Sequence, residues 1–175
     1  MSLRDWTKKS GAFRIGELSA DDSVLKHLTT GTKYLECTSN GTIAIPSKQA
    51  YGTWEFNVNK GATTNNLFVP FIADSVGTSV GGYNDSCGYS IAINNLQRLS
   101  LRINSNGTGS RLFDTGSDYI TINTDYSIKV TRSLAGKFTV YIKGGSFGWD
   151  YWTTVRSTTD NTYTTSNYFV ADLDS

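Results

Sequence analysis

Apolar and polar residues alternate one by one along most of this chain. In WEFNVN, residues 54–59, the apolar residues Trp54, Phe56 and Val58 fall on one side of an extended backbone, and polar residues fall on the other. Successive side chains of a β-strand point to opposite faces of the sheet. This period of two therefore predicts a half-buried strand in which Glu55 faces outward.

The stretch LSLRIN, residues 99–104, repeats the pattern. Here Leu99, Leu101 and Ile103 are expected to point inward, and the residues expected to point outward are Ser100, Arg102 and Asn104. Further strands are expected in YSIAIN, LFVPFIA, WTTV and YFVADL. Helical periodicity is confined to SADDSVLKHLTTG, residues 19–31, which predicts no more than a short helix.

Two turns join predicted strands into hairpins. Asn106-Gly107 is a strong signal for a tight β-turn, and SLAG separates two alternating runs within residues 126–143. The chain is rich in Ser, Thr, Asn, Gly and aromatic residues and holds only two prolines, a composition typical of short strands joined by polar turns. About a dozen strands at this spacing predict an all-β fold, an antiparallel two-sheet sandwich. We find no internal repeat and no linker, and expect residues 1–175 to form a single domain.

Charge and targeting signals exclude several classes of protein. The net charge is +1, which predicts neither a nucleic-acid surface nor a polybasic membrane patch. No apolar run approaches the roughly 18 residues of a membrane span, and the start, MSLRDWTKKSGAF, has no apolar segment typical of a signal peptide. Synthesis in a reducing cytosol favours free thiols at Cys37 and Cys87.

Three segments carry a resemblance to a known family. YSIKVTRSLAGKFTVYIKGG resembles the hairpin of laminin-G-like and concanavalin A-like jelly-roll domains, and AYGTWEFNVNKG resembles a strand of laminarinase-type glucanases of the same superfamily. NTYTTSNYFVADLDS resembles a closing segment of laminin-G-like domains in viral, phage and metagenomic proteins. The resemblance spans residues 5–175 and implies a concanavalin A-like jelly roll.

The end of the sequence departs from that resemblance. The similar domains carry one more apolar strand after the Leu-Asp segment, whereas this sequence stops at Ser175. A last strand is therefore expected to be missing, shortened or supplied by a neighbour. AFRIGEL, residues 12–18, is expected to pair with a terminal strand. An unpaired edge is a template for another chain, which predicts a homo-oligomer or a complex rather than an isolated monomer. The alternative is that a loop or the segment LRDW covers the edge.

A glycosidase needs two carboxyl groups, about 5 to 5.5 Å apart in retaining enzymes. The enzymes of the superfamily place them on one strand as Glu-x-Asp-x-x-Glu, but no glutamate follows Glu55, and the other two, Glu17 and Glu36, lie in early strands. Glu55 is therefore expected to be an outward strand residue in a polar cross-strand pair. We predict no catalytic residue and no hydrolase activity.

The sequence contains little that would form a zinc site, a phosphate-binding loop or a calcium site. His27 is the only histidine, and it lacks zinc-ligand spacing to either cysteine. The glycine-rich VGTSVGG precedes no helix signal, which argues against a phosphate loop. Laminin-G-like and lectin relatives bind calcium through loop oxygens, so the resemblance makes Asn84 and Asp85 candidate ligands. Two oxygens are too few for a site, and turn chemistry accounts for both. We expect no cofactor, calcium being the only candidate.

The loop GGSFGWDYWTT concentrates aromatic residues. The resemblance implies that Trp152 faces the core, whereas Trp149 and Tyr151 are extra aromatics on which sugar rings could stack, with Asp150 holding hydroxyls. The alternative is that both rings pack on the rim of the sandwich. A second part of this candidate glycan site is the turn GGYNDS, with its residues Tyr83, Asn84 and Asp85. The sequence leaves open whether the two parts meet.

Three functions are compared on this basis. The leading hypothesis is a non-enzymatic virion protein, because the similar domains occur in viral and phage proteins. Such a protein would be made in the host cytoplasm as a capsid decoration, fibre or appendage subunit of a phage or virus. It would bind capsid, tail or copies of itself. The alternative is a carbohydrate-binding module that recognises cell-surface glycans. A β-glucanase comes last, because the carboxylate pair is missing.

Overall fold

The computed structural model describes residues 7–8, 13–17, 33–37, 41–61, 66–77, 79–80 and 83–173. The expected short helix and His27 lie outside these residues, so the structure does not bear on them. No helix in the described part is long and apolar enough to span a membrane.

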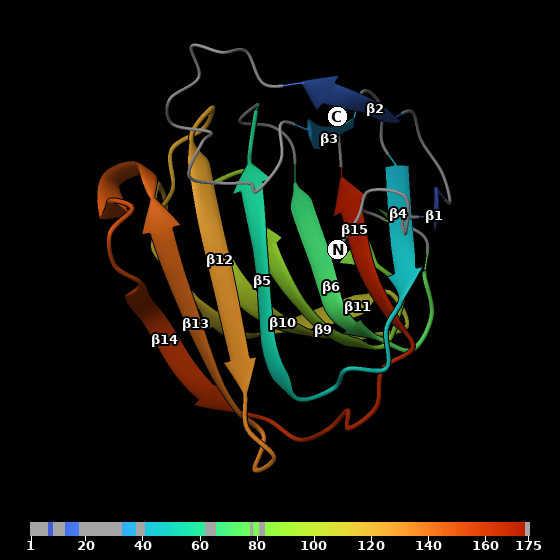
Figure 1. Ribbon diagram of the computed structural model, residues 1–175. Coiled ribbons are helices and arrows are strands. Elements are labelled where there is room, and N and C mark those ends of the chain that lie inside the picture. Colours follow the sequence, from blue (N-terminus) through green and yellow to red (C-terminus); the bar gives the residue numbers. More distant parts are fainter. Residues whose placement is uncertain are drawn as a thin grey trace.

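The described strands form two large antiparallel sheets and two small ones (Figure 1). The larger sheet has seven strands, in the order β1 (Thr7–Lys8), β4 (Gly41–Pro46), β15 (Tyr168–Leu173), β6 (Leu67–Ala73), β9 (Gly88–Ile93), β10 (Leu99–Ser105) and β11 (Thr108–Asp114). The smaller has four, in the order β14 (Thr153–Thr159), β13 (Lys137–Gly144), β12 (Asp125–Arg132) and β5 (Gly52–Asn59). The pairs β2 (Phe13–Glu17) with β3 (Lys33–Cys37), and β7 (Ser79–Val80) with β8 (Tyr83–Asn84), are separate. The all-β, two-sheet prediction is confirmed.

The core lies between the two large sheets. On β5, Trp54 is buried and its ring packs against Phe71 of β6 at a centroid distance of 4.9 Å, while Glu55 on the same strand is exposed. The predicted faces of this strand are therefore confirmed. The four-stranded sheet adds alternate residues of its two central strands to the core, namely Tyr126, Ile128, Val130, Phe138, Val140 and Ile142.

Strand β10 differs from the prediction on its second face. Leu99 and Leu101 are buried in the core as expected, but the expected outward residues are buried too, with Arg102 only 5% exposed. Their polar groups find partners within the sheet: Arg102 Nη2 donates to the Gly109 carbonyl at 2.9 Å, and Asn104 Nδ2 donates to Ser90 Oγ at 2.9 Å. Polar groups can be buried where a sheet supplies hydrogen-bond partners, so alternation alone does not reveal exposure.

Both predicted hairpins are present. Asn106 and Gly107 form the turn between β10 and β11, with φ angles of 47° and 78°. Positive φ at both central turn residues is the conformation that makes an Asn-Gly turn fit the twist of a hairpin. Strands β12 and β13 pair over their full lengths around a turn in which Gly136 N donates to the Ser133 carbonyl.

The expectations for the terminal strand are wrong. Strand β15 lies inside the seven-stranded sheet, hydrogen bonded to β4 on one side and to β6 on the other, so it leaves no open edge (Figure 1). The segment AFRIGEL contributes β2, which pairs with β3 and not with the terminal strand. Residues 41–46 of β4 pair with β15 instead, and in this register Thr42 Oγ1 donates to Asp172 Oδ1 at 3.1 Å.

The sandwich has two ends, which we name by their landmarks. At the helical end, the 3₁₀ turn η3 (Gly145–Phe147) follows β13, and the ring of Phe147 packs on that of Tyr119 at 5.2 Å. At the hairpin end lie the β10–β11 turn and Gly88, whose strand position faces Asn104 of β10. At this same end the β12–β13 turn begins after Arg132.

Candidate functional site

Aromatic and basic side chains gather on the outer face of the four-stranded sheet. Strand register places Lys129 of β12 between Glu55 of β5 and Tyr141 of β13. These positions alternate with the buried core residues of each strand, so their side chains face away from the core. The ring of Trp152, just before β14, completes the group. We call Lys129, Tyr141, Lys143 and Trp152 the aromatic–lysine surface.

Both lysines of this surface lie against aromatic rings. Lys129 Nζ is 4.3 Å from the centroid of the Trp152 ring and 4.6 Å from that of Tyr141. Lys143 Nζ is 4.7 Å from the same Trp152 centroid. All four residues are half-buried, so each remains in part accessible to solvent. The negative faces of the rings attract both ammonium groups and hold them near one another despite their like charge.

Small polar groups surround the aromatic–lysine surface. Thr139 and Ser157 share a hydrogen bond at 2.8 Å between their hydroxyls, and Ser127 Oγ donates to Asn57 Oδ1 at 2.5 Å. Hydroxyl and amide groups both donate and accept hydrogen bonds, which matches the chemistry of sugar hydroxyls. The outer face therefore combines rings, charges and hydrogen-bonding groups on one rigid sheet.

The structure corrects the prediction for Trp152. This residue was expected in the core, but its ring lies over two outward lysines and is not among the residues that pack into the core. The adjacent core position is filled instead by Phe147, whose ring lies 6.2 Å from that of Tyr126. The bend at η3 reverses the chain after β13, and it brings Phe147 inward and leaves Trp152 outside.

The two other aromatics of the loop differ from each other. Tyr151 is 83% exposed, and Asp150 beside it is also exposed. Trp149 is half-buried, and its ring covers Gly144, where a Cβ would come within 2.8 Å of two ring atoms. Trp149 thus packs on the rim, whereas Tyr151 is available at the surface.

The turn with Tyr83, Asn84 and Asp85 lies at the other end of the sandwich. The Cβ of Asp85 is 3.7 Å from the position that a Cβ would take at Gly107, in the β10–β11 turn. Nearby, the thiol of Cys87 is free and donates to Asn106 Oδ1 at 3.4 Å. The structure therefore does not bring this turn together with Tyr151, which lies at the helical end.

A pocket that sequence reasoning missed opens at the hairpin end. It has a volume of about 590 Å³ and is bounded by the β10–β11 hairpin and by Thr162 and Tyr163. Its wall is mostly backbone and small hydroxyl side chains, with Tyr163 as the aromatic member, and its lining holds no charged residue. No local sequence pattern marks it, because the hairpin and residues 162–163 meet only through the fold.

Beside this pocket lies the buried guanidinium of Arg132, which is surrounded by its hydrogen-bond acceptors and by aromatic rings. Arg132 is 2% exposed, donates to the carbonyls of Ala50 and Asp160 at 3.0 and 3.1 Å, and lies 4.8 Å from the ring centroid of Tyr89. Burial, followed by the hydrogen bond to Asp160, raises the pKa of Tyr89 to about 12. Burial pushes the pKa of Asp160 upward, but hydrogen bonds from Tyr89 and Thr162 outweigh it and leave that pKa below its usual value. We interpret this cluster as structural.

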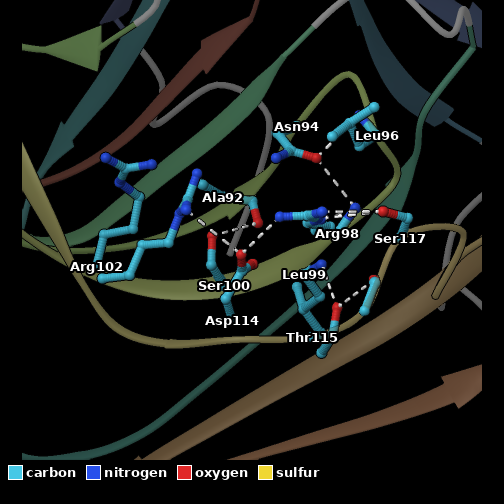
Figure 2. A network of polar contacts seen from close by, with 12 residues as sticks. Ala92, Asn94, Leu96, Arg98, Leu99, Ser100, Arg102, Asp114, Thr115 and Ser117 are labelled. Carbon is cyan, nitrogen blue, oxygen red and sulfur yellow. Dashed lines mark hydrogen bonds and ion pairs between the residues drawn. The ribbon is translucent and has the colours of Figure 1, made fainter.

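A second charged network braces the helical end (Figure 2). Arg98 reaches Asp114 Oδ2 at 3.5 Å and donates to Ser117 Oγ at 3.0 Å, and Arg111 lies 3.6 Å from the same carboxylate. The network ties the β9–β10 turn to the end of β11. Its arginines have a carboxylate partner, unlike Lys129 and Lys143, for which the described part of the chain provides no ion pair.

Glu55 occupies the place predicted for it. It is exposed and lies across from Lys129 in a polar cross-strand pair. The outward positions next to it on β5 and β12 hold Thr53, Asn57, Ser127 and Thr131, so no carboxyl group neighbours it there. Elsewhere in the described residues no three His, Cys, Asp or Glu side chains gather as a metal site would require. Calcium binding stays a prediction.

The sequence matches no family model and no curated protein. Among solved structures, the carbohydrate binding module CBM66 from Bacillus subtilis is similar with a TM-score of 0.59, covering 97% of this chain and 92% of that chain at 12% identity. Tailspike protein 2 of bacteriophage CBA120, in its enzymatically active domain, is similar with a TM-score of 0.57, covering 96% of this chain and 25% of that chain at 14% identity. An endo-β-1,4-glucuronan lyase from Trichoderma reesei is similar with a TM-score of 0.52, covering 98% and 80% at 14% identity. The fold is a concanavalin A-like jelly roll.

In this jelly roll, the sequence pointed to Tyr151 as a candidate but not to Tyr141, Lys129 or Lys143. A signal was present: the inward positions of the predicted hairpin are filled by Tyr126, Ile128, Val130, Phe138, Val140 and Ile142, so Tyr141 falls on the opposite, outward face and is not needed for the core. The position of Trp152 above the two lysines had no such signal, since it depends on the path of the chain through η3.

Proposed function

We propose that this jelly roll is a carbohydrate-binding module whose site is the aromatic–lysine surface together with Tyr151. The observation that carries the proposal is the position of Trp152 and Tyr141: two large aromatic residues outside the core, side by side with a loop whose Tyr151 is 83% exposed. Core packing accounts for the other large rings, such as Trp54 and Phe71, but not for these.

The chemistry of the surface fits a sugar ring. An aromatic ring offers a flat apolar area against which the C–H face of a pyranose can stack, while its electron-rich face favours polarised hydrogens. Hydroxyls at the ring edge then meet donors and acceptors such as the exposed Asn57 and the half-buried Thr139. Because the site is built on paired strands, these groups are held in place before the sugar arrives.

We further propose that the module is not catalytic. Glu55 is the carboxylate nearest to the surface in the strand register, and the positions around it carry hydroxyl, amide and amine groups. Acid–base cleavage of a glycosidic bond needs a second carboxyl group, which no neighbouring position on β5 or β12 supplies. A binding role uses the same surface without such a group.

The likeness to CBM66 concerns the fold alone at 12% identity, so the surface carries the proposal. A glycan array compares the wild-type chain with Trp152→Ala, Tyr141→Ala and Tyr151→Ala. The matched control is Leu134→Ala, a residue 81% exposed on the β12–β13 turn. We expect a set of glycans to bind the wild type and the Leu134→Ala control but not Trp152→Ala. Equal binding by all four variants would exclude this surface as the site.

A second role concerns where such a module works. We also propose that the chain is a subunit or module of a virion appendage; the likeness to the tailspike domain, 14% identical and covering 25% of that chain, concerns the fold alone, so this role is a separate proposal with its own test. In that role it would bind capsid or tail proteins, or copies of itself, and hold the particle near host glycans. Mass spectrometry of purified virus particles tests whether the chain is present in them. The control is a preparation of particles assembled without the chain. Its absence from particles would exclude the role and leave the glycan-binding proposal standing.

A further inference from the structure

We infer that the aromatic–lysine surface takes an acidic sugar, and specifically a polysaccharide with one carboxylate per residue, such as a uronic-acid polymer. This inference rests on the proposed glycan-binding function and names the substrate class of that same site. The observation behind it is the pair of ammonium groups, from Lys129 and Lys143, which lie 4.3 and 4.7 Å from the centroid of one tryptophan ring.

Among the residues that the structure describes, no anionic group pairs with either ammonium group. Neither forms an ion pair within the described residues, although Glu55 is directly across the strand from Lys129. Their contacts are with the rings of Trp152 and Tyr141, which leave their hydrogen-bonding capacity open to a ligand. A neutral sugar would use the rings but would leave both charges unused.

The geometry suits a charge carried by the bound sugar itself. Both ammonium groups lie over the Trp152 ring and reach it from neighbouring strands, so a sugar that contacts the edge of this ring lies beside both lysines. The carboxylate of a uronic acid is attached directly to the sugar ring and extends from its edge. Contact at the edge of Trp152 therefore brings the carboxylate within reach of an ammonium group, so that the ring contact and the charge contact support each other.

Charge density favours a carboxylated polymer over a sulfated one. Glu55 faces outward on the neighbouring strand, Asp150 is exposed on the adjoining loop, and the whole chain carries a net charge of +1. A highly sulfated glycan would need a dense basic surface to offset its charge, and the acidic groups here would repel it. Two lysines flanked by acidic residues match a ligand with a single negative charge per sugar.

The test uses three matched hexasaccharides with the same β-1,4 linkage: oligoglucuronate, cellohexaose and sulfated cellohexaose. Binding is measured by isothermal titration calorimetry for the wild type, Lys129→Gln, Lys143→Gln and Trp152→Ala. Lys137→Gln is the control, because Lys137 is exposed on the same strand as Lys143 but at the hairpin end. Gln keeps much of the side-chain length and removes only the charge, and thermal melting confirms that each variant is folded.

We expect oligoglucuronate to bind more tightly than cellohexaose, and its affinity to fall as salt is raised toward about 0.5 M. Lys129→Gln and Lys143→Gln should each weaken oligoglucuronate binding about threefold to tenfold, with cellohexaose binding unchanged. Lys137→Gln should resemble the wild type, and Trp152→Ala should lose both sugars.

The contrary results separate the two proposals. Cellohexaose bound as tightly as oligoglucuronate, with loss in Trp152→Ala but not in the lysine variants, would overturn the acidic-sugar inference and retain glycan binding. Tighter binding of the sulfated sugar would overturn the carboxylate assignment. No binding of these sugars, and none of any glycan on the array, would remove the proposed function together with this inference.

Discussion

The phenol of Tyr89 in the seven-stranded sheet donates a hydrogen bond to the carboxylate of Asp160, which directly follows the last strand of the four-stranded sheet. The same phenol oxygen accepts a hydrogen bond from the Tyr163 backbone at 3.2 Å. This contact connects the two sheets at the hairpin end, where the ring of Tyr89 also packs on Phe138 of the opposite sheet at 4.8 Å.

The first prediction follows from the pKa of Tyr89, which burial and Asp160 raise to about 12. A tyrosine in an unfolded chain has a pKa of about 10. Between about pH 10 and 12 the unfolded chain therefore loses this proton while the folded protein keeps it, and stability falls as pH rises. Below pH 10 the contribution is fully present. The loss from this one group is at most about 1.4 kcal/mol per pH unit.

Urea unfolding at a series of pH values measures this slope in the wild type and in Tyr89→Phe. The variant should be less stable at neutral pH, because Asp160 loses its donor, but its stability should fall less steeply above pH 10. Tyr151→Phe is the control, since its ring lies in solvent. The same slope in Tyr89→Phe as in the wild type would contradict the prediction.

The second prediction concerns Arg132, a buried guanidinium with donors to Ala50, Asp160 and Asn161. Arg132→Lys should destabilise the protein by about 2 to 4 kcal/mol, because the ammonium group of lysine cannot donate to all three acceptors that the planar guanidinium reaches. The exposed Arg156→Lys should change stability by less than about 0.5 kcal/mol. Chemical denaturation provides both values, and similar losses in the two variants would show that burial of Arg132 is not the cause.

Trp54 and Trp152 provide a third, paired prediction. Trp54→Ala removes a ring that is 5% exposed and packed on Phe71, and should cost about 3 to 5 kcal/mol. Trp152→Ala removes a half-buried ring whose contacts include two lysines, and should cost about 1 to 2 kcal/mol. Melting temperatures are expected to fall much further for the first variant. The reverse order would mean that Trp152, not Trp54, belongs to the core.

A fourth prediction tests the close approach of β6 and β9. Gly88 has a φ of 148°, and a Cβ there would lie 1.8 Å from the Ile72 carbonyl oxygen. Gly88→Ala should therefore destabilise the protein by about 3 kcal/mol or more, since a central strand would have to move. Gly116→Ala is the control, because nothing lies within 4 Å of its Cβ position. If Gly88→Ala is as stable as this control, the backbone at Gly88 must differ from the one described.

The last prediction separates two aromatics of one loop. Trp149→Ala should lower thermal stability, because its ring covers Gly144 next to the core. Tyr151→Ala should leave stability unchanged and reduce only glycan binding, because its ring is 83% exposed. A thermal scan together with one binding assay decides between them. A stable Trp149→Ala variant with lost binding would move Trp149 from the rim into the site.

Local patterns were enough to predict most strands of the two large sheets, two hairpins and the faces of β5, but they did not reveal β4 (Gly41–Pro46). Alternation of Trp54 and Glu55 depends only on the geometry of an extended chain, and Asn106-Gly107 marks a turn through its own backbone preferences. The outward position of Glu55 followed for the same reason, whereas the expectation that this residue is not catalytic came from the missing second carboxyl group.

Only the tertiary structure decided which distant segments meet. The place of β15 between β4 and β6 depends on pairing between residues as far apart as Thr42 and Asp172, for which no local pattern exists. The sequence left open whether Tyr83 and Tyr151 meet, and the strand order of the two sheets places them at opposite ends. Trp152 faces outward because the turn η3 redirects the chain and Phe147 fills the core position. Side-chain burial is a property of the packed sheets as a whole, so the sequence around one residue does not contain it.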